Sequence, residues 1–184
     1  RSIATVLPPR LRVPVAVWKV CAKSRSASPM LRASSSIACD TGAIASSGKF
    51  ALAIQPVDMA SQLRVYNKDG SLQYEYDFAD TYVNAVALNS DGTRGAVASV
   101  TSRSGRLVTR ITVLDFSKTE PVAEYESENN LVLGLLWTRD NRVLAVGDQA
   151  ALVSNGSFEF EAYDYGGREV TALCLTDSRA VVSV

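Results

Sequence analysis

The chain has 184 residues, of which 47% are hydrophobic and 21% are charged, with 19 basic and 19 acidic residues. A chain of this length buries about 70% of the surface that its unfolded form exposes, which is enough for one domain with its own core. This composition excludes a disordered polar chain and a polytopic membrane protein. The longest clean apolar stretch, Leu131 to Trp137, has the length of a strand and not of a membrane-spanning helix.

Histidine is absent, and the three cysteines, Cys21, Cys39 and Cys174, are far apart with no CxxC pair. The absence of histidine removes the commonest general base near neutral pH and the commonest metal ligand. Widely spaced cysteines in odd number predict buried or idle thiols. We therefore predict no catalytic, cofactor-binding or metal-ligating residue and no cofactor, and no motif assigns a ligand-binding residue.

The first part of the chain differs in composition from the rest. Residues 1–39 contain seven basic residues and no acidic one, whereas the remainder contains 12 basic and 19 acidic residues. Four of the six prolines and a serine-rich run, Ser24 to Ser36, also lie in the first part. We interpret residues 1–40 as a basic leader, poorly ordered or atypical, in which Val13 to Val20 fits one strand. A transit peptide and a basic arm for nucleic acid or anionic lipid are the alternatives.

From residue 41 onward, short β-type runs separated by turn residues recur in the same order. We expect a propeller-like domain over 41–184, with blades at about 41–78, 81–127 and 130–163 and a partial blade at 168–184. In chain order the predicted strands are 43–46, 50–54, 62–66 and 72–78; then 82–88, 95–100, 106–114 and 122–126; then 131–137, 143–146, 150–153 and 158–163; and finally 170–175 and 180–184.

The turns between the first two strands of each copy recur at a regular distance. They contain Gly48, Gly92, Asn141 and Ser178, which are 44, 49 and 37 residues apart. Periods of this length are typical of β-propeller repeats. Because Gly and Asn tolerate positive φ, pairs such as Asp-Gly and the Asn-Gly pair at 155–156 predict two-residue hairpin turns.

The first two strands of each copy are apolar on both faces and rich in small residues, as in 83–88, whereas the later two carry polar faces, as in 123–126. That gradient is typical of a blade running from a dry centre to a wet rim. The sequence therefore predicts an all-β fold, a β-propeller-like array of four-stranded antiparallel blades. A two-layer β-sandwich explains the strands and turns but not the repetition.

About three and a third blades are readable, whereas closed propellers have about four to eight. We therefore expect an incomplete propeller from a longer protein, or one that completes its ring with a partner. Bare sheet edges in an open ring invite self-association through the blade edges.

Five fragments jointly resemble a known family. In order they are LRVYNKDG at 63–70, YVNAVALNSDG at 82–92, EPVAEY at 120–125, NRVLAVGD at 141–148 and YDYGGR at 163–168. They resemble an uncharacterised family of bacterial propeller-like proteins, common in Gram-positive bacteria and known only as a domain of unknown function, with repeats similar to WD40 and quinoprotein repeats. The resemblance implies a membrane-anchoring helix near the N-terminus and a propeller outside the cytoplasm, and it offers no catalytic residue.

Several polar and aromatic groups have a structural and a functional interpretation. We expect Asp69, Asp91, Asp140 and Asp177 to bond nearby backbone amides within turns. The acidic residues Glu124, Glu126 and Glu128 share one face of an outer strand, where a solvated edge is favoured over a calcium site. For the aromatic group Tyr74, Tyr76, Phe78 and Tyr82, packing between blades is favoured over a ligand platform. The glycine pair at 166–167 predicts a turn and not a phosphate loop.

The leading hypothesis for function is a non-enzymatic interaction module that binds a protein, peptide or glycan partner at the bacterial surface. The alternative is a propeller enzyme, such as a lactonase, glycosidase or quinoprotein-like enzyme, with its site in the central channel. That alternative calls for a carboxylate pair on the first strands of adjacent blades, and the strands as predicted offer Asn84 and no acid. We expect no nucleic-acid partner and no membrane span in this segment, while an anchor elsewhere in the natural protein stays open.

Overall fold

The computed structural model describes residues 38–55, 61–168, 170–176 and 179–184. The basic leader up to residue 37, including the strand predicted at Val13 to Val20, lies outside the described residues. Within the described part the elements are strands connected by turns. No helix among these residues is long and apolar enough to cross a membrane.

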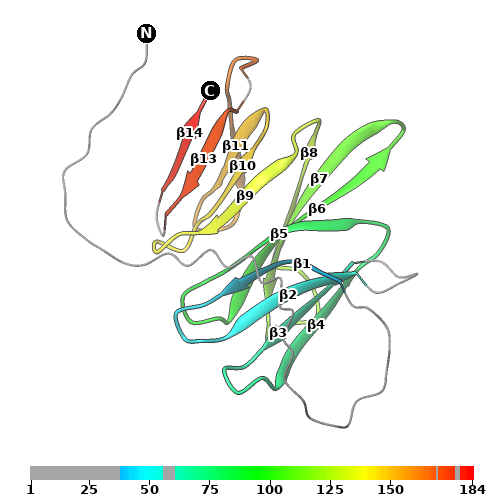
Figure 1. The fold of residues 1–184 in the computed structure, drawn as a ribbon, viewed down its shortest axis with the longest axis vertical. Coiled ribbons are helices and arrows are strands. Elements are labelled where there is room, and N and C mark those ends of the chain that lie inside the picture. The colour runs from blue at the N-terminus through cyan, green and yellow to red at the C-terminus, as the bar shows by residue number, and fades with distance from the viewer. Residues whose placement is uncertain (1–37, 56–60, 169, 177–178) are drawn as a thin grey trace, which may run out of the picture.

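The strands form three four-stranded sheets and a two-stranded hairpin, each antiparallel and each in sequence order (Figure 1). Sheet 1 contains β1 (Ala38–Ile44), β2 (Phe50–Gln55), β3 (Ser61–Tyr66) and β4 (Leu72–Phe78); sheet 2 contains β5 (Tyr82–Leu88), β6 (Arg94–Arg103), β7 (Arg106–Asp115) and β8 (Ala123–Glu128); sheet 3 contains β9 (Val132–Trp137), β10 (Val143–Gly147), β11 (Ala150–Ser154) and β12 (Phe160–Asp164); the C-terminal hairpin contains β13 (Ala172–Leu175) and β14 (Ala180–Ser183). The predicted four-strand repeat is confirmed.

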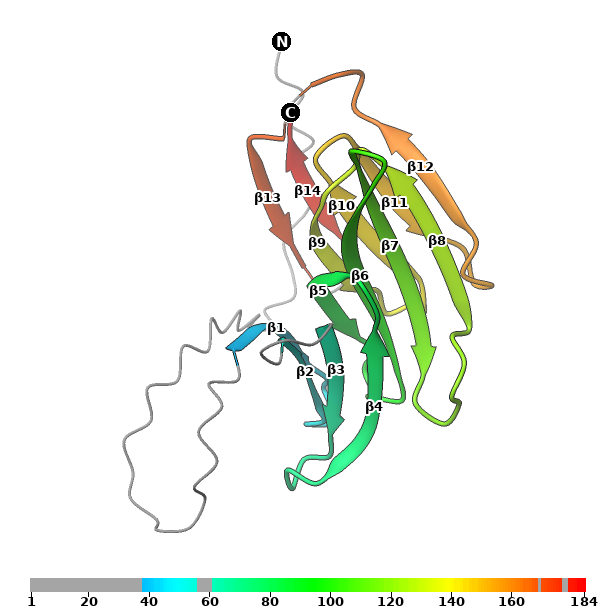
Figure 2. The ribbon, with the colours of Figure 1, turned by 90° about the vertical axis from the view of Figure 1, so that its right-hand side faces the viewer.

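The sheets are stacked around their first strands. The first strand of each sheet contacts the first strand of the next: β1 packs on β5, β5 packs on β9, and β9 packs on β13 of the C-terminal hairpin. The later strands of each sheet point away from this shared region, so that the sheets fan out from it (Figures 1 and 2). The fold is therefore propeller-like, as predicted, and within the described residues the fan does not close into a ring.

Sheet 2 is covered on both faces. The apolar side chains along β6 point alternately to one face and to the other. Ala96 and Ala98 belong to the core cluster shared with sheet 3, which includes Leu152. The residue between them, Val97, belongs to the cluster shared with sheet 1, which includes Leu63. Successive side chains of a strand point to opposite faces, so one short run of small apolar residues fills both interfaces. A two-layer sandwich would bury only one face of this strand.

Most of the turns differ from the two-residue type predicted from sequence. In most of them the backbone N–H of one residue donates to the backbone C=O of the residue four positions later. Asn67 and Ser71 form such a bond, with 2.9 Å between nitrogen and oxygen. The residue before the return carries positive φ, as at Gly70 (84°) and Asn141 (61°). This is a three-residue loop built from a type I turn and a left-handed residue. The Asn-Gly prediction is wrong in detail, because the left-handed residue of that loop is Phe158 (φ 61°).

Candidate functional site

A long hairpin projects at one end of sheet 2. Strands β6 and β7 meet in a two-residue turn, where Arg103 pairs with Arg106 and both Ser104 (φ 52°) and Gly105 (φ 76°) are left-handed. Positive φ at both positions defines a type I′ turn, whose twist matches the strands. The neighbouring strands stop short, because β5 pairs with β6 only as far as Val100 and β8 pairs with β7 only from residue 108. The projecting tip therefore forms a wall beside the end of β5.

A β-bulge lies in the first strand of each four-stranded sheet. The register between β5 and β6 skips Asn84, because Val83 opposes Ser99 and Ala85 opposes Ala98. The same irregularity skips residue 40 in β1 and residue 133 in β9. The three bulge residues are 44 and 49 residues apart, the same distances that separate the repeated turns. A bulge redirects the side chain of its extra residue, so this position aims Asn84 differently from the core residues beside it.

The nitrogen and the oxygen of the Asn84 side-chain amide differ in their hydrogen bonding. Its Nδ2 donates to the backbone oxygen of Val132, at 2.6 Å, and so connects sheets 2 and 3. Its Oδ1 is buried and has no hydrogen-bond partner within the protein. A buried acceptor without a donor costs about 1–3 kcal/mol, and such a group in a native fold calls for an explanation.

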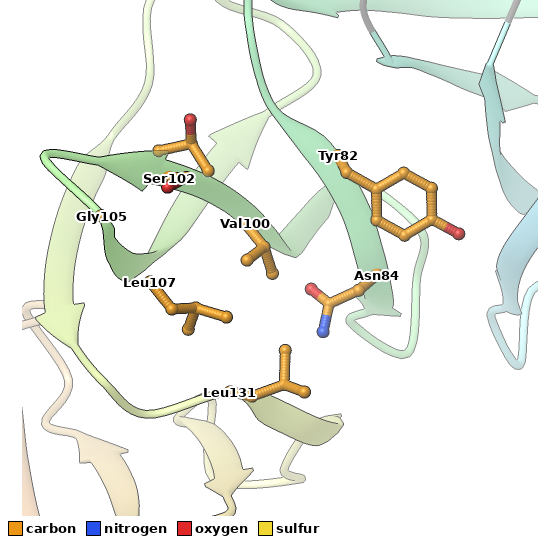
Figure 3. Close-up of a pocket in the computed structure, with 8 residues that line it drawn as sticks. Tyr82, Asn84, Val100, Ser102, Gly105, Leu107 and Leu131 are labelled. Atoms are coloured by element: carbon orange, nitrogen blue, oxygen red, sulfur yellow. The ribbon is translucent and has the colours of Figure 1, made fainter.

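The Asn84 side chain lines an open pocket of about 670 Å³. The lining residues come from β5, the projecting hairpin and the connection before β9; they are Tyr82, Asn84, Val100, Thr101, Ser102, Gly105, Leu107 and Leu131. The side chains of Asn84, Val100, Leu107 and Leu131 point toward one another, with Tyr82 at the margin (Figure 3). No lining residue carries a charge. The volume falls within the range of about 300–1,000 Å³ that is usual for ligand pockets.

Strained loops surround this pocket. Among the described residues, three of the five non-glycine residues with positive φ lie on the loops at this end, namely Asp80, Ser104 and Asn129. The strained conformations are held by hydrogen bonds: Thr101 Oγ1 donates to the Asp80 oxygen at 3.0 Å, and the Asn129 N–H donates to the Leu107 oxygen at 2.8 Å. Strained backbone of this kind concentrates at functional sites.

The loop that carries Leu131 is fixed by buried polar contacts. Asn130 is 2% exposed, and its Oδ1 accepts the backbone N–H groups of Gln149 and Ala150 at 3.1 and 3.0 Å. The Leu131 N–H donates to the carboxylate of Asp148 at 2.7 Å. Gly147 makes room for this arrangement, because a Cβ there would lie 2.0 Å from the Asn130 Oδ1. One wall of the pocket is therefore preorganised.

The predicted turn role is confirmed for Asp69 and Asp91. The carboxylate of Asp69 accepts the N–H and hydroxyl of Ser71, and that of Asp91 accepts the N–H and hydroxyl of Thr93. The hydrogen bonds from Ser71 and Thr93 lower the pKa of the two carboxyls. Asp140 instead pairs with the guanidinium of Arg142. Asp177 lies outside the described residues.

The glutamates at 124, 126 and 128 lie on β8, the outermost strand of sheet 2, as predicted. Glu126 accepts hydrogen bonds from Arg110 at 2.7 Å and from Arg103 at 3.3 Å, and Glu128 accepts one from Arg106 at 3.0 Å. Side-chain hydrogen bonding by Arg110 and then Arg103 lowers the pKa of Glu126. Among the described residues, no group of three or more carboxylate or cysteine side chains is placed to hold a metal ion.

The aromatic group divides between two places. Tyr74 packs against Phe116 with ring centroids 5.1 Å apart, and Tyr76 packs against Phe78 at 5.0 Å. The rings of Tyr74, Tyr76 and Phe78, together with Phe116, belong to or pack on the core between sheets 1 and 2, as predicted for inter-blade packing. The prediction is wrong for Tyr82, which is 43% exposed and lines the pocket. The glycine pair at 166–167 forms a left-handed bend after β12, as expected for a turn.

One of the first strands contains an acidic residue, contrary to the sequence prediction. Strand β1 begins at Ala38, before the predicted start at residue 43, and therefore includes Asp40. The register places Asp40 at the bulge of β1, equivalent to Asn84 in β5. The first strands of the other described sheets contain no second carboxylate, so the pair expected of a channel enzyme is not found among them.

Comparison with known proteins identifies the family. A model of the family of unknown function DUF5711 matches residues 31–178. The chain belongs to this family. No curated protein matches the sequence.

Two solved structures are similar to this DUF5711 chain. One is KlHsv2 with loop 6CD replaced by a Gly-Ser linker, with a TM-score of 0.51 at 12% identity, covering 80% of this chain and 45% of that chain. Another is the C-terminal WD40 domain of Sif2, with a TM-score of 0.39 at 13% identity, covering 79% of this chain and 51% of that chain. The DUF5711 chain thus spans about half the length of these structures. At this identity the first likeness concerns the fold alone.

Proposed function

We propose that residues 41–184 form a non-enzymatic interaction module that binds a partner at the pocket between sheets 2 and 3. One observation carries the proposal: a bulge places Asn84 in the wall of an uncharged, mostly apolar pocket of about 670 Å³, and the loops beside the pocket hold strained, left-handed residues. A pocket that is mostly apolar, with a few convergent polar groups, is the usual form of a binding site.

The enzyme alternative has less support. The pocket contains no carboxylate, cysteine or lysine, so its lining supplies a phenol, hydroxyls and one amide. General acid–base catalysis most often uses His, Asp, Glu or Lys, and none of these residues lines the pocket. These residues are suited to positioning a ligand by shape and hydrogen bonding.

Selection from a random dodecapeptide library displayed on phage, followed by a glycan array, tests the proposal. The immobilised protein is the described chain, and Leu107→Asp, which places a charge in the pocket, is the variant. Leu72→Asp is the matched control, because Leu72 is an exposed leucine of sheet 1. We expect ligands that bind the chain and the Leu72→Asp control but lose binding to Leu107→Asp. Enriched ligands that bind all three forms equally would contradict the proposed site.

We further propose that the natural protein presents this module outside the cytoplasm of a Gram-positive bacterium on a membrane anchor. The support is the resemblance of the five repeat fragments to such proteins. Protease treatment of intact cells of the source organism, followed by detection of the module with an antibody, tests this. Degradation in intact cells is expected, and protection until lysis would contradict it.

A further inference from the structure

We propose that two copies of this chain associate head to tail and close into one ring. In this arrangement the C-terminal hairpin of each copy packs on the free face of sheet 1 of the other copy. The inference goes beyond the proposed function, because the pocket between sheets 2 and 3 belongs to neither of these surfaces.

The strand ladders show which residues face the preceding sheet. Residues paired across neighbouring strands share one face of a sheet. In sheet 2 the last pair before the first turn is Leu88 and Gly95, and Leu88 packs on the cluster shared with sheet 1. In sheet 3 that pair is Trp137 and Val143, and both belong to the cluster shared with sheet 2. The last pair of the first two strands thus faces the preceding sheet.

The next pair along the same two strands faces the following sheet. In sheet 1 this pair is Ala43 and Ala51, which belong to or pack on the cluster shared with sheet 2. In sheet 2 it is Ala87 and Ala96, which belong to the cluster shared with sheet 3. Each inner contact therefore joins the last pair of one sheet to the next-to-last pair of the sheet before it.

This rule leaves an apolar face open where the fan begins. The last pair of sheet 1 is Ile44 and Phe50, on the face opposite to Ala43 and Ala51. Among the described residues no sheet precedes sheet 1. Ile44 is 70% exposed, whereas its counterpart Trp137 in sheet 3 is 7% exposed. We call Ile44 and Phe50 the start face.

A second apolar face is open where the fan ends. In the hairpin the last pair is Leu175 and Ala180, and Leu175 lies against Gly134 of sheet 3. The next pair, Cys174 and Val181, therefore points away from sheet 3. Val181 is 63% exposed, and no sheet follows the hairpin in the described chain. We call Cys174 and Val181 the end face.

The two open faces are the two halves of a contact that the chain already makes between its own sheets. Strands β1 and β2 contact β5, and strands β5 and β6 contact β9. The first two strands of one sheet thus contact the first strand of the next. The hairpin consists of two such strands, and β1 is the free first strand at the other end of the fan (Figure 1). A second copy therefore offers each open face a matching apolar surface, whose burial drives association.

The number of sheets favours a ring of two copies. Each copy has three four-stranded sheets and one hairpin, so two copies supply eight blades, two of them hairpins. Closed propellers have about four to eight blades, a range that a third copy would exceed. Head-to-tail contacts form a ring when the rotation closes and a filament when it does not. In a ring of two, the first contact holds the second pair of faces close together and so strengthens the dimer.

Light scattering during size-exclusion chromatography of the full chain tests the proposal. A reducing agent is present, so that the exposed Cys174 cannot join two copies by a disulfide. We expect the mass of two copies, falling toward the mass of one copy on dilution. The mass of one copy at every concentration would overturn the proposal, and it is the result expected if only further sheets of a longer natural chain cover these faces.

Two variants test the two faces separately. Ile44→Asp places a carboxylate in the start face, and Val181→Asp places one in the end face. Because each face takes part in a contact of the ring in both copies, each variant should raise the dissociation constant of the dimer by about tenfold or more. Val122→Asp is the matched control, because Val122 is also an exposed valine but lies beside β8, outside both faces. Its dimer should be unchanged.

The outcomes are distinct. Dissociation of only one of the two variants would indicate a face that pairs with its own copy, and would overturn the head-to-tail arrangement. A mass that grows beyond two copies with concentration would indicate a filament and overturn the closed ring. A dimer that survives both variants, or one that Val122→Asp weakens as much, would overturn the assignment of the faces. A β-type circular dichroism spectrum shows that each variant is folded, and the mass of the unaltered chain tests the dimer without any variant.

Discussion

The side-chain nitrogen of Asn84 lies 2.6 Å from the backbone oxygen of Val132, and this hydrogen bond joins the first strands of sheets 2 and 3. Asn84 is the extra residue of the β5 bulge, and Val132 immediately precedes the corresponding bulge residue of β9. The repeated irregularity in the first strands thus has a structural role, because it brings an amide of one sheet to the backbone of the next. The same residue lines the pocket of the candidate site.

Loss of this bond should reduce stability. We expect Asn84→Ala to lower the free energy of unfolding by about 1 kcal/mol, the usual contribution of one hydrogen bond. Asn84→Asp should lower it further at neutral pH, because a carboxylate cannot donate and would face the Val132 oxygen. Urea unfolding at pH 7 measures both changes. An Asp variant as stable as the original would contradict the donor role.

The C-terminal hairpin should depend on a glycine of sheet 3. A Cβ on Gly134 would lie 2.8 Å from side-chain atoms of both Leu173 and Leu175 on β13. We expect Gly134→Ala to cost about 1–3 kcal/mol through overpacking, with faster hydrogen exchange in β13 and β14. Gly156→Ala is the control, because nothing lies within 4 Å of a Cβ there and its φ is not positive. Equal effects of the two substitutions would contradict the docking of the hairpin on β9.

The three-residue loops can be tested where no packing intervenes. Gly70 has φ of 84°, and a Cβ there meets no atom within 4 Å. Gly70→Ala should therefore cost about 1 kcal/mol by backbone strain alone. Gly70→Asn should cost less, because Asn tolerates the left-handed conformation better than Ala. Thermal unfolding of the two variants measures these changes. A Gly70→Ala variant as stable as the original would show that Gly70 is not left-handed in solution.

Stability should be lost in acid. The hydroxyl of Thr93 holds the pKa of Asp91 below its usual range, that of Ser117 does so for Asp115, and Arg110 does so for Glu126. A carboxyl whose pKa is lower in the folded state stabilises the fold above its unfolded pKa, about 4, and this contribution disappears as the pH falls through the folded value. Glu126→Gln should therefore make the loss of stability in acid less steep.

The free energy of unfolding should also fall at high pH. Between the acid and the alkaline ranges it should stay nearly constant. Burial raises the pKa of Tyr74 and Tyr76, so the contribution of each phenol is present below its unfolded pKa of about 10 and is lost as the pH rises through the folded value. The chain has no histidine to titrate between about pH 5 and 8. Urea unfolding from pH 2 to 11 measures the profile, and a pronounced step between pH 6 and 7 would contradict it.

Most of the fold was predictable because its signals are local. The alternation of side chains in 106–114 and the small apolar residues of 83–88 specify strands without reference to the rest of the chain, and both strands form where predicted. Left-handed turn residues at 48, 92 and 141 marked the period correctly. Phe158 was misplaced in a strand because its buried ring packs on Trp137, 5.5 Å away, and this tertiary contact holds an unfavourable backbone conformation.

The site was less predictable because it depends on pairing register. Val100, Leu107 and Leu131 have the sequence pattern of core residues, and only the different lengths of β5, β6, β7 and β8 expose them to a pocket. Asn84 was noticed as the polar residue of an inner strand, but its bulge is a property of the β5–β6 ladder. One signal in the sequence points to Asn84: it lies 44 residues after Asp40, the same distance that separates the turn residues Gly48 and Gly92.

Methyl NMR on the three consecutive residues Ala96, Val97 and Ala98 of β6 tests the arrangement of the sheets most directly. We predict nuclear Overhauser contacts from Ala96 and Ala98 to methyl groups of sheet 3, such as Val143 and Leu152, and from Val97 to methyl groups of sheet 1, such as Leu63. Contacts from all three residues to the same sheet would show two stacked layers and would contradict both the fan of sheets and the pocket between them.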